Sequence, residues 1–314
     1  MKTVMVTGAS GMIGLALTET LLEKGFKVIG TDSKPNDFVN SPNYSFVQAS
    51  IDDKSSITNI LNGSSIDALV HLACSCDNDF PPIITSAEEK LSSAVDKYLY
   101  KAAVDAGVGD IILLSTYQVY APQKTREPIR ETSDEKPTTA YGKMKYESER
   151  AMAKVVTKSP SCKCVIARVS PIYTKTFTDN LKAKVFDPKE GCAFVYGYGD
   201  YGYSFCCVYN LVDFIVGILN IAPGVNYMGV YNVCDTKPIA AKDILDVLRE
   251  CHAIGAVVQR NLGSEGIKGL FNFGGGGKND YRYNDISLAC SNISYDNTKA
   301  QRISAFRWKL SNTK

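Results

Sequence analysis

Histidine is almost absent from this sequence, and its cysteines are not spaced as metal ligands. The 314 residues include only two histidines, His71 and His252. None of the ten cysteines stands three residues from another, which is the spacing of zinc and thioredoxin-type motifs. Most cysteines lie in apolar runs, so we expect them to be small buried side chains. His71 lies in the apolar run 68–73 and is expected to be a hydrogen-bonded core residue, and no metal site is predicted.

A large excess of charge and long hydrophobic runs are also missing. The formal net charge is only +2, which gives no reason to expect nucleic acid or a membrane surface as a partner. No apolar run is long enough to span a bilayer, and the first residues already form a predicted core strand rather than a secretory signal. We therefore expect a soluble protein of the cytoplasm. Its 314 residues, 45% of them hydrophobic, suit one large or two modest domains.

A glycine-rich turn between a strand and a helix lies close to the N-terminus. Residues 4–6 are apolar and predict a buried strand, residues 15–24 have the apolar spacing of a helix, and a second apolar run ends at Asp32. Three glycines stand between the first strand and the helix at three-residue spacing: Gly8, Gly11 and Gly14. Glycine allows the backbone to approach a pyrophosphate, the start of a helix attracts phosphate charge, and a carboxylate after the second strand accepts hydrogen bonds from a ribose.

This order of elements predicts a dinucleotide-binding site, against the alternative of a glycine turn that serves packing alone. Asp32 would repel the ribose 2′-phosphate of NADP. The two residues after it include only one base, Lys34. The sequence therefore favours NAD as the cofactor.

Predicted strands and helices alternate along the first half of the chain. The strands are expected at residues 44–48, 66–73 and 110–115, and the helices at residues 52–61 and 87–106. Alternation of this kind is typical of an α/β fold, in which a doubly wound parallel sheet is covered by helices on both faces.

Hydroxyl side chains follow the strand predicted at residues 110–115. In open parallel sheets, ligands bind at the carboxyl ends of the strands, where Thr116 stands. A helix predicted to begin at Tyr141 places Tyr141 and Lys145 four residues apart on one face. A tyrosine has an unperturbed pKa of about 10, and a neighbouring ammonium favours its phenolate, so this phenol becomes a usable acid and base near neutral pH. The alternative is an amphipathic helix with an exposed lysine and a half-buried tyrosine.

Together these motifs resemble the extended short-chain dehydrogenase/reductase family, also called the NAD-dependent epimerase/dehydratase family. The resemblance runs from Met1 to about Trp308 and rests on Thr7–Gly14, Asp32, His71–Ala73, Ser115–Tyr120, Tyr141–Lys145, Arg168–Tyr173, Val230–Val233 and Asp296–Trp308. It implies a Rossmann domain at residues 1–170 with a return segment at 205–235. A smaller C-terminal substrate-binding lobe would then comprise residues 171–204 and 236–314.

The resemblance also implies roles for particular residues. The catalytic trio would be Thr116, Tyr141 and Lys145. The NAD-binding residues would be Gly8, Ser10, Gly11, Met12, Ile13, Gly14, Asp32, Ser33, Ser50, Ile51, Leu72, Ala73, Cys74, Tyr141, Lys145 and Pro171. The substrate would contact Cys76, Thr116, Gln118, Tyr141 and Tyr203. The family further implies a homodimer, in which the helices at residues 87–106 and 141–154 pack as a four-helix bundle.

Several departures from the family pattern bear on the substrate. Relatives that eliminate water carry Asp-Glu after the threonine, whereas Tyr117 and Gln118 stand here, so dehydration is not expected. Ser50 stands where the family usually has Asp, and Pro171 where its sugar-nucleotide enzymes usually have Asn. Tyr203 replaces the arginine that usually pairs with the diphosphate of the substrate. The candidates to replace that arginine are Lys182, Lys184, Lys278 and Arg282.

Three functions follow as hypotheses. The first is an NAD-dependent nucleotide-sugar epimerase or ketoreductase. The second keeps the redox site but acts on a small carbonyl or alcohol without a nucleotide, because the expected arginine and asparagine are absent. The third is a catalytically silent NAD-binding regulatory protein, against which the intact Thr116, Tyr141 and Lys145 argue.

Overall fold

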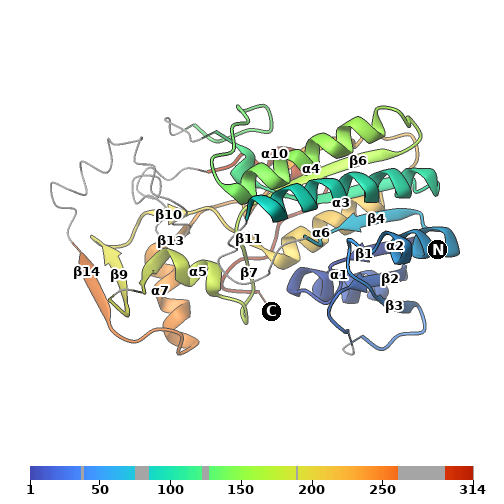
Figure 1. Cartoon of the computed structure of the whole chain (residues 1–314). Helices are drawn as coiled ribbons and strands as arrows, with labels where there is room; N and C mark the ends of the chain where they lie inside the picture. The colour runs from blue at the N-terminus through green and yellow to red at the C-terminus, as the bar shows by residue number, and fades with distance from the viewer. Residues whose placement is uncertain (37–38, 75–84, 122–126, 189, 261–293, 314) are drawn as a thin grey trace. The chain divides into compact units, whose positions relative to one another are not determined.

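The structure is a computed structural model, and it describes residues 1–36, 39–74, 85–121, 127–188, 190–260 and 294–313 (Figure 1). The chain divides into two compact units. Unit 1 comprises Met1–Ala121, Asp134–Val169 and Val212–Tyr231, and unit 2 comprises Pro122–Ser133, Ser170–Leu211 and Asn232–Lys314. The limits expected above for a Rossmann domain and a substrate lobe stay a prediction.

A seven-stranded sheet forms the centre of the fold. Its strands stand in the order β12-β6-β5-β4-β1-β2-β3. Their bounds are β1 Thr3–Thr7, β2 Lys27–Asp32, β3 Tyr44–Gln48, β4 Ala68–His71, β5 Asp110–Thr116, β6 Lys163–Val169 and β12 Gly229–Val233. The neighbouring pairs from β6 to β3 are all parallel. The predicted α/β fold with a doubly wound parallel sheet is therefore confirmed.

Buried apolar side chains explain why these strands lie at the centre. Val4, Met5 and Val6 in β1 have no exposed surface, and every residue of β4 is buried. Strands that are covered on both faces need such continuous apolar runs. The helices that belong to this part of the chain are α1 Met12–Glu23, α2 Lys54–Gly63, α3 Ser86–Asp105, α4 Ala140–Val156 and α6 Val208–Leu219, with a short 3-10 helix, η1, at Tyr117–Val119.

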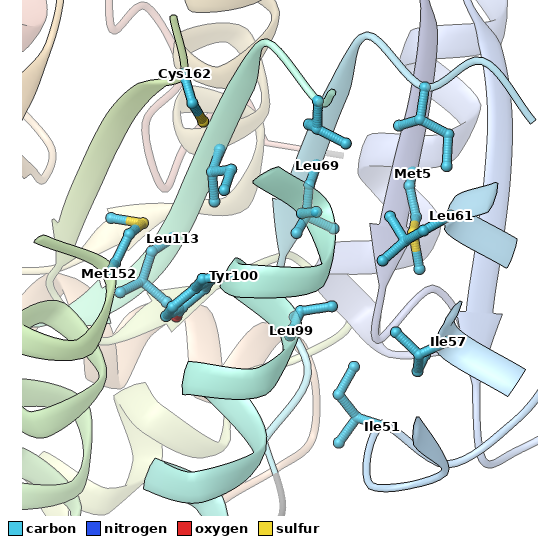
Figure 2. Close-up of a cluster of buried hydrophobic side chains, with 14 of the residues drawn as sticks. Met5, Ile51, Ile57, Leu61, Leu69, Leu99, Tyr100, Leu113, Met152 and Cys162 are labelled. Atoms are coloured by element: carbon cyan, nitrogen blue, oxygen red, sulfur yellow. The ribbon is translucent and has the colours of Figure 1, made fainter. Parts of the chain in front are cut away.

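One large core cluster joins the sheet to α2, α3 and α4. Figure 2 shows its members from the strands beside those from the helices. The strands contribute Met5, Leu69 and Leu113, and the helices contribute Ile57, Leu61, Leu99, Tyr100 and Met152. Because α3 and α4 pack against each other over this cluster, they run side by side along the sheet (Figure 1).

A buried ion pair fastens α4 to the end of the sheet. The Arg168 guanidinium on β6 donates to both carboxylate oxygens of Glu149 on α4, with Nε 3.1 Å and Nη2 2.6 Å from them. Ser115 on β5 also donates to Glu149. Arg168 and Glu149 are 2% and 4% exposed, so the charges are stabilised by each other rather than by water. The pair therefore holds α4 against the carboxyl ends of β5 and β6.

Unit 2 is built from short elements. They are β7 Ile172–Tyr173, α5 Asp179–Val185, β8 Phe186–Asp187, β9 Cys192–Tyr196, β10 Gly202–Tyr203, β11 Cys206–Cys207, β13 Ile239–Ala240, α7 Ala241–Glu250, β14 Val257–Arg260 and α10 Thr298–Gln301. Small sheets pair β10 with β13, β11 with β7, and β9 with β8 and β14. The half-buried Asp235 carboxylate ties several segments together, because it accepts hydrogen bonds from the Tyr173 hydroxyl, the Cys207 amide and the Asn210 side chain.

The side chains that were scarce or unclustered in the sequence have ordinary structural surroundings. The cysteines that the structure describes are free thiols, and Cys162, Cys206, Cys207 and Cys234 are buried, whereas Cys251 is exposed. Within the described ranges, no group of histidine, cysteine and carboxylate side chains is arranged to hold a metal ion. No helix in the same ranges has both the length and the apolar character needed to cross a membrane.

Replacing Arg168 tests the importance of the buried ion pair. Arg168→Met leaves the Glu149 carboxylate buried without its main partner, so we expect the free energy of unfolding to fall by about 3–5 kcal/mol. The double variant Arg168→Met/Glu149→Leu replaces the pair by apolar side chains and is expected to regain most of that loss. Urea unfolding followed by circular dichroism measures both values. An unchanged midpoint for the single variant would show that the pair does not hold α4.

Candidate cofactor and active site

A cavity of about 330 Å³ lies in unit 1 at the carboxyl ends of β1, β2 and β4. The predicted cofactor residues that line it are Gly8, Ser10, Gly11, Met12, Ile13, Gly14, Asp32, Ser33, Ile51, Leu72, Ala73 and Cys74. The predicted residues Ser50, Tyr141, Lys145 and Pro171 are not part of its lining. The lining also contains four residues that were not predicted from the sequence to bind the cofactor: Thr7, Thr31, Lys34 and Ala49. Their places in the sequence could have identified them, because each lies within two residues of a residue predicted to bind the cofactor.

The glycines of the turn serve two different purposes. A Cβ on Gly8 would lie 2.9 Å from the Ala73 amide nitrogen, and one on Gly14 only 2.1 Å from the Gly8 carbonyl oxygen. The packing of the protein itself therefore demands glycine at positions 8 and 14. Gly11 is different, because its φ is −75° and a Cβ there would be 3.4 Å from the Gly8 carbonyl oxygen, an ordinary contact. None of the described residues requires glycine at position 11, so its missing side chain leaves room for a bound group.

The N-terminus of α1 provides positive potential at the same cavity. Gly11 is the N-cap residue and supplies no side-chain hydrogen bond, and the first turn of α1 has no acidic residue. The first amide groups of a helix have no partners within the helix, and they carry the positive end of its dipole. Met12, Ile13 and Gly14 of this turn line the cavity. The arrangement fits a phosphate group.

The Asp32 carboxylate is held at the end of β2 by backbone amides. Its Oδ2 accepts a hydrogen bond from the Ser10 amide and its Oδ1 one from the Lys34 amide, both at 3.0 Å. An ionised carboxylate has about four acceptor positions, so this one can accept further hydrogen bonds from a ribose. Burial and the nearby Asp32 charge raise the pKa of Tyr44 to about 12, so this neighbouring phenol stays neutral.

A chain of hydrogen bonds fixes the floor of the cavity. The Ala73 amide donates to Thr7 Oγ1 at 3.3 Å, Thr7 Oγ1 lies 2.8 Å from His71 Nδ1, and His71 Nε2 lies 3.1 Å from Asp96 Oδ1. Burial raises the pKa of the Asp96 carboxyl, but His71 and Lys145 lower it by more, so its pKa lies below the ordinary value. With Asp96 ionised, His71 Nε2 donates to it, and Nδ1 accepts from the Thr7 hydroxyl. His71 is the hydrogen-bonded core residue that the sequence predicted.

The start of α4 is tied to the loop that follows β5. The Thr139 hydroxyl caps α4 by accepting from the Gly142 amide at 3.0 Å, and it donates to Gln118 Oε1 at 2.6 Å. Thr116 Oγ1 in turn accepts from the Gln118 amide at 3.3 Å. A Cβ on Gly142 would lie 2.5 Å from the Gln118 carbonyl oxygen, so only glycine allows this close approach. Tyr141 precedes Gly142 and is therefore positioned by the same contacts.

Tyr141 and Lys145 share one side of α4, as their spacing predicts. Lys145 Nζ lies 6.0 Å from the centroid of the Tyr141 ring. Lys145 is only 3% exposed, whereas Tyr141 is half-buried and accessible. The structure therefore brings together the ammonium and the phenol that the sequence predicted as a pair, and their role in proton transfer stays a prediction.

Two predicted site residues belong to unit 2: Tyr203, predicted to contact the substrate, and Pro171, predicted to contact the cofactor. Tyr203 is 8% exposed, and its ring packs edge-on against Tyr201 and Phe205. Pro171 lies between β6 and β7, and its carbonyl accepts from the Cys206 amide at 3.0 Å. Among the cations proposed to replace the expected arginine, Lys184 lies over the Tyr203 ring. Cys76, Lys278 and Arg282 lie outside the described residues.

A second cavity shows that volume alone does not identify the site. It measures about 530 Å³ and lies at the amino ends of β1, β5 and β6. Its lining includes Lys2, Lys24, Asp110, Lys163 and Tyr227, and it contains none of the residues predicted to bind cofactor or substrate. Ligands of parallel sheets bind at the opposite, carboxyl ends of the strands. The smaller cavity at the glycine turn is therefore the better candidate.

Comparison with known proteins agrees with this assignment. Residues 4–234 match the model of the NAD dependent epimerase/dehydratase family. The chain belongs to that family. The match covers the glycine turn, Asp32, Thr116, Tyr141 and Lys145, and it extends to the end of β12.

The chain is similar in sequence to proteins that carry different enzyme names. UDP-glucuronate 4-epimerase from Thermodesulfobacterium geofontis (strain OPF15) is 28% identical over 137 residues, which are 38% of this chain and 41% of the relative. Methionine adenosyltransferase 2 subunit beta from Xenopus laevis is 26% identical over 155 residues, which are 47% of this chain and 42% of the relative. The matched part thus spans less than half the length of each of these relatives.

Solved structures of similar fold superpose on nearly the whole chain. UDP-glucuronic acid 4-epimerase from Bacillus cereus, solved in complex with NAD, superposes with a TM-score of 0.70 at 18% sequence identity. The superposition covers 99% of this chain and 95% of that one. At such low identity the likeness establishes the fold.

Gly142 offers a direct test of how α4 is positioned. In Gly142→Ala the new Cβ would meet the Gln118 carbonyl, so we expect the free energy of unfolding to fall by about 1–3 kcal/mol as the first turn of α4 moves. Gly63→Ala is the control, because Gly63 ends α2 and a Cβ there meets nothing within 4 Å. The control should be neutral or slightly stabilising. Thermal unfolding measures the melting temperatures of the two variants. Equal melting temperatures for Gly142→Ala and Gly63→Ala would contradict the close approach of Gly142 to the Gln118 carbonyl.

Proposed function

We propose that this protein binds NAD in the cavity at the glycine turn and acts as a nucleotide-sugar epimerase or ketoreductase. The observation that carries the proposal is the cavity itself, in a chain that belongs to an NAD-dependent family. Its glycine at position 11, free helix N-terminus and fixed carboxylate match the pyrophosphate and the ribose of a dinucleotide. Asp32 would repel a 2′-phosphate, which favours NAD over NADP.

Each group around the cavity has a part in holding the cofactor. The first amides of α1 would face the pyrophosphate, and Asp32 would accept hydrogen bonds from the adenosine ribose. The backbone after β4, which the Thr7–His71–Asp96 chain holds in place, would line the path toward the nicotinamide. Bound NAD supplies the acceptor and the donor of a hydride.

The proton chemistry falls to side chains at the start of α4 and the end of β5. Tyr141 would take the proton from a substrate hydroxyl and return it later in the cycle. Lys145 would stabilise the phenolate of Tyr141 between these events and contact the nicotinamide ribose. Thr116 would hold the reacting oxygen by a hydrogen bond. Gln118 follows Thr116 in place of an acidic residue, so no carboxylate is present there to drive elimination of water.

A nucleotide sugar is the substrate class that the comparisons support. One relative is named a UDP-glucuronate 4-epimerase, and the Bacillus cereus structure carries a name of the same meaning. Another relative is named as a subunit, methionine adenosyltransferase 2 subunit beta, and this name favours a second candidate, a catalytically silent NAD-binding regulatory protein. Tyr203 stands where an arginine usually pairs with the diphosphate of the substrate. This difference favours the alternative of a small substrate without a nucleotide. The homodimer and the location in the cytoplasm stay predictions.

Two glycine variants separate ligand binding from packing. Gly11→Ala should leave the melting temperature of the free protein nearly unchanged, because the new Cβ makes only an ordinary contact. It should weaken NAD binding at least about tenfold, because the methyl group occupies space needed by the pyrophosphate. Gly14→Ala should instead destabilise the free protein, since its Cβ would overlap the Gly8 carbonyl. Calorimetric titration with NAD and thermal unfolding measure the two effects, and full NAD affinity in Gly11→Ala would contradict the proposed site.

Replacing the phenol tests the catalytic assignment. Tyr141→Phe removes the hydroxyl that exchanges the proton, so turnover of a nucleotide sugar should fall by about 10²–10⁴-fold. NAD binding should persist, because Tyr141 is not part of the cavity lining. Nuclear magnetic resonance of UDP-glucose and UDP-glucuronate mixtures detects epimer formation by the parent and the variant. Absence of turnover in the parent, with NAD bound, would support the regulatory alternative.

A further inference from the structure

Lys184 is a buried cation without a carboxylate partner in the described part of unit 2. It lies on α5 and is only 7% exposed. None of the ion pairs formed by the described residues includes it. Its contact is instead with a ring, since Nζ lies 5.6 Å from the centroid of Tyr203. A cation–π contact compensates only part of the cost of removing an ammonium from water.

Two partly exposed cations of unit 2, Arg260 and Lys182, are satisfied differently from Lys184. Arg260 on β14 pairs with Asp187 at 2.9 Å and with Glu190 at 2.6 Å. Lys182 lies on the same helix as Lys184, is half-buried, and places its ammonium 4.5 Å from the Phe186 centroid. Lys184 combines deep burial with the lack of an anion. Burial alone lowers the pKa of the Lys184 ammonium to about 7, so the free protein holds this charge weakly.

The surroundings of Lys184 are rigid. The Tyr203 hydroxyl donates to the Lys184 carbonyl at 3.3 Å, which ties β10 to the end of α5. Leu181 and Val185, on either side along α5, have no exposed surface and belong to the same core cluster as Tyr203. A flexible surface lysine can turn toward water, but this one is held between packed elements. A bound anion would provide the counter-charge that none of the described residues supplies.

We infer that Lys184 and Tyr203 form a subsite of unit 2 that binds an anionic oxygen group of the substrate. This inference rests on the proposed function, in which the substrate is a nucleotide sugar. Such a substrate offers two anionic groups, the diphosphate and, in a sugar acid, the carboxylate. The ammonium of Lys184 would donate charge-assisted hydrogen bonds to one of them, while the Tyr203 ring fixes the direction of the lysine.

Matched lysine variants of unit 2 test this subsite. We expect Lys184→Met to raise the melting temperature of the free protein, because it removes a buried charge that has no carboxylate partner among the described residues. The same variant should bind UDP at least about tenfold more weakly, since a charge-assisted hydrogen bond is lost. Lys184→Arg keeps the charge and should retain more of the affinity than the methionine variant. Lys237→Met, at an exposed lysine of unit 2, is the control and should bind UDP as the parent does.

Titrations with different anions identify the group that is bound. UDP, inorganic pyrophosphate and glucuronate are each titrated calorimetrically into the parent and into Lys184→Met. A Lys184-dependent affinity for UDP or pyrophosphate assigns the subsite to the diphosphate, and one for glucuronate assigns it to the sugar carboxylate. Two outcomes would overturn the inference. In the first, Lys184→Met is less stable than the parent protein and binds every anion with the affinity of the parent. In the second, the parent protein itself binds none of the three anions. NAD binding, titrated separately, reports on the proposed function independently of these outcomes.

Discussion

Contact between backbone atoms at the glycine turn is the constraint on which the rest of the site depends. At Gly8 the turn touches the backbone after β4, and at Gly14 the first turn of α1 lies against the Gly8 carbonyl. Any side chain at these two positions would push β1, β4 and α1 apart. At Gly8 and Gly14 the turn is packed against protein backbone, whereas at Gly11 the space of the missing side chain is not filled by atoms of the described residues. The turn is therefore densely packed on the side of the protein and open on the side of the cavity.

Buried polar groups carry this arrangement from the cavity to the helices. The chain from Ala73 through Thr7 and His71 ends on Asp96, which belongs to α3. The ion pair of Arg168 and Glu149 fastens α4 in a similar way. Charged groups in a core are costly unless every partner is present, so these networks leave the helices few alternative positions. Such rigidity suits a reaction in which a proton is exchanged over a short distance.

Unit 2 shows the opposite treatment of charge. Its Asp235 carboxylate is fully engaged by hydrogen-bond donors of the protein. Its Lys184 ammonium lies on a more deeply buried side chain, with an aromatic ring beside it and no carboxylate partner within the described residues. Membership of the NAD-dependent epimerase/dehydratase family makes a cofactor-binding unit expected. The substrate is a separate question, because one fold carries many different sites. The proposed subsite at Lys184 and Tyr203 is one place at which the preference for a substrate can be tested.

Local patterns in the sequence determined most of the fold and the position of the candidate cofactor site. Apolar runs and helical spacing predicted β1, α1, β2 and a doubly wound parallel sheet, because these depend on neighbouring residues and on simple periodicity. Glycine spacing followed by Asp32 predicted the part of the cavity lining that lies at the turn, and the resemblance to the family implied Ile51 and Leu72–Cys74. The spacing of Tyr141 and Lys145 predicted a shared face of α4, and the structure shows it.

Only the tertiary structure decided which distant side chains meet. The pairing of Glu149 with Arg168, the link from His71 to Asp96 and the fit of Gly142 against Gln118 join residues from different elements, and no short-range pattern encodes them. The same is true of Lys184, whose sequence neighbours do not distinguish it from Lys182. Burial and the presence of a counter-charge are properties of packing, because they depend on everything that surrounds a side chain in space rather than on what precedes and follows it in the chain.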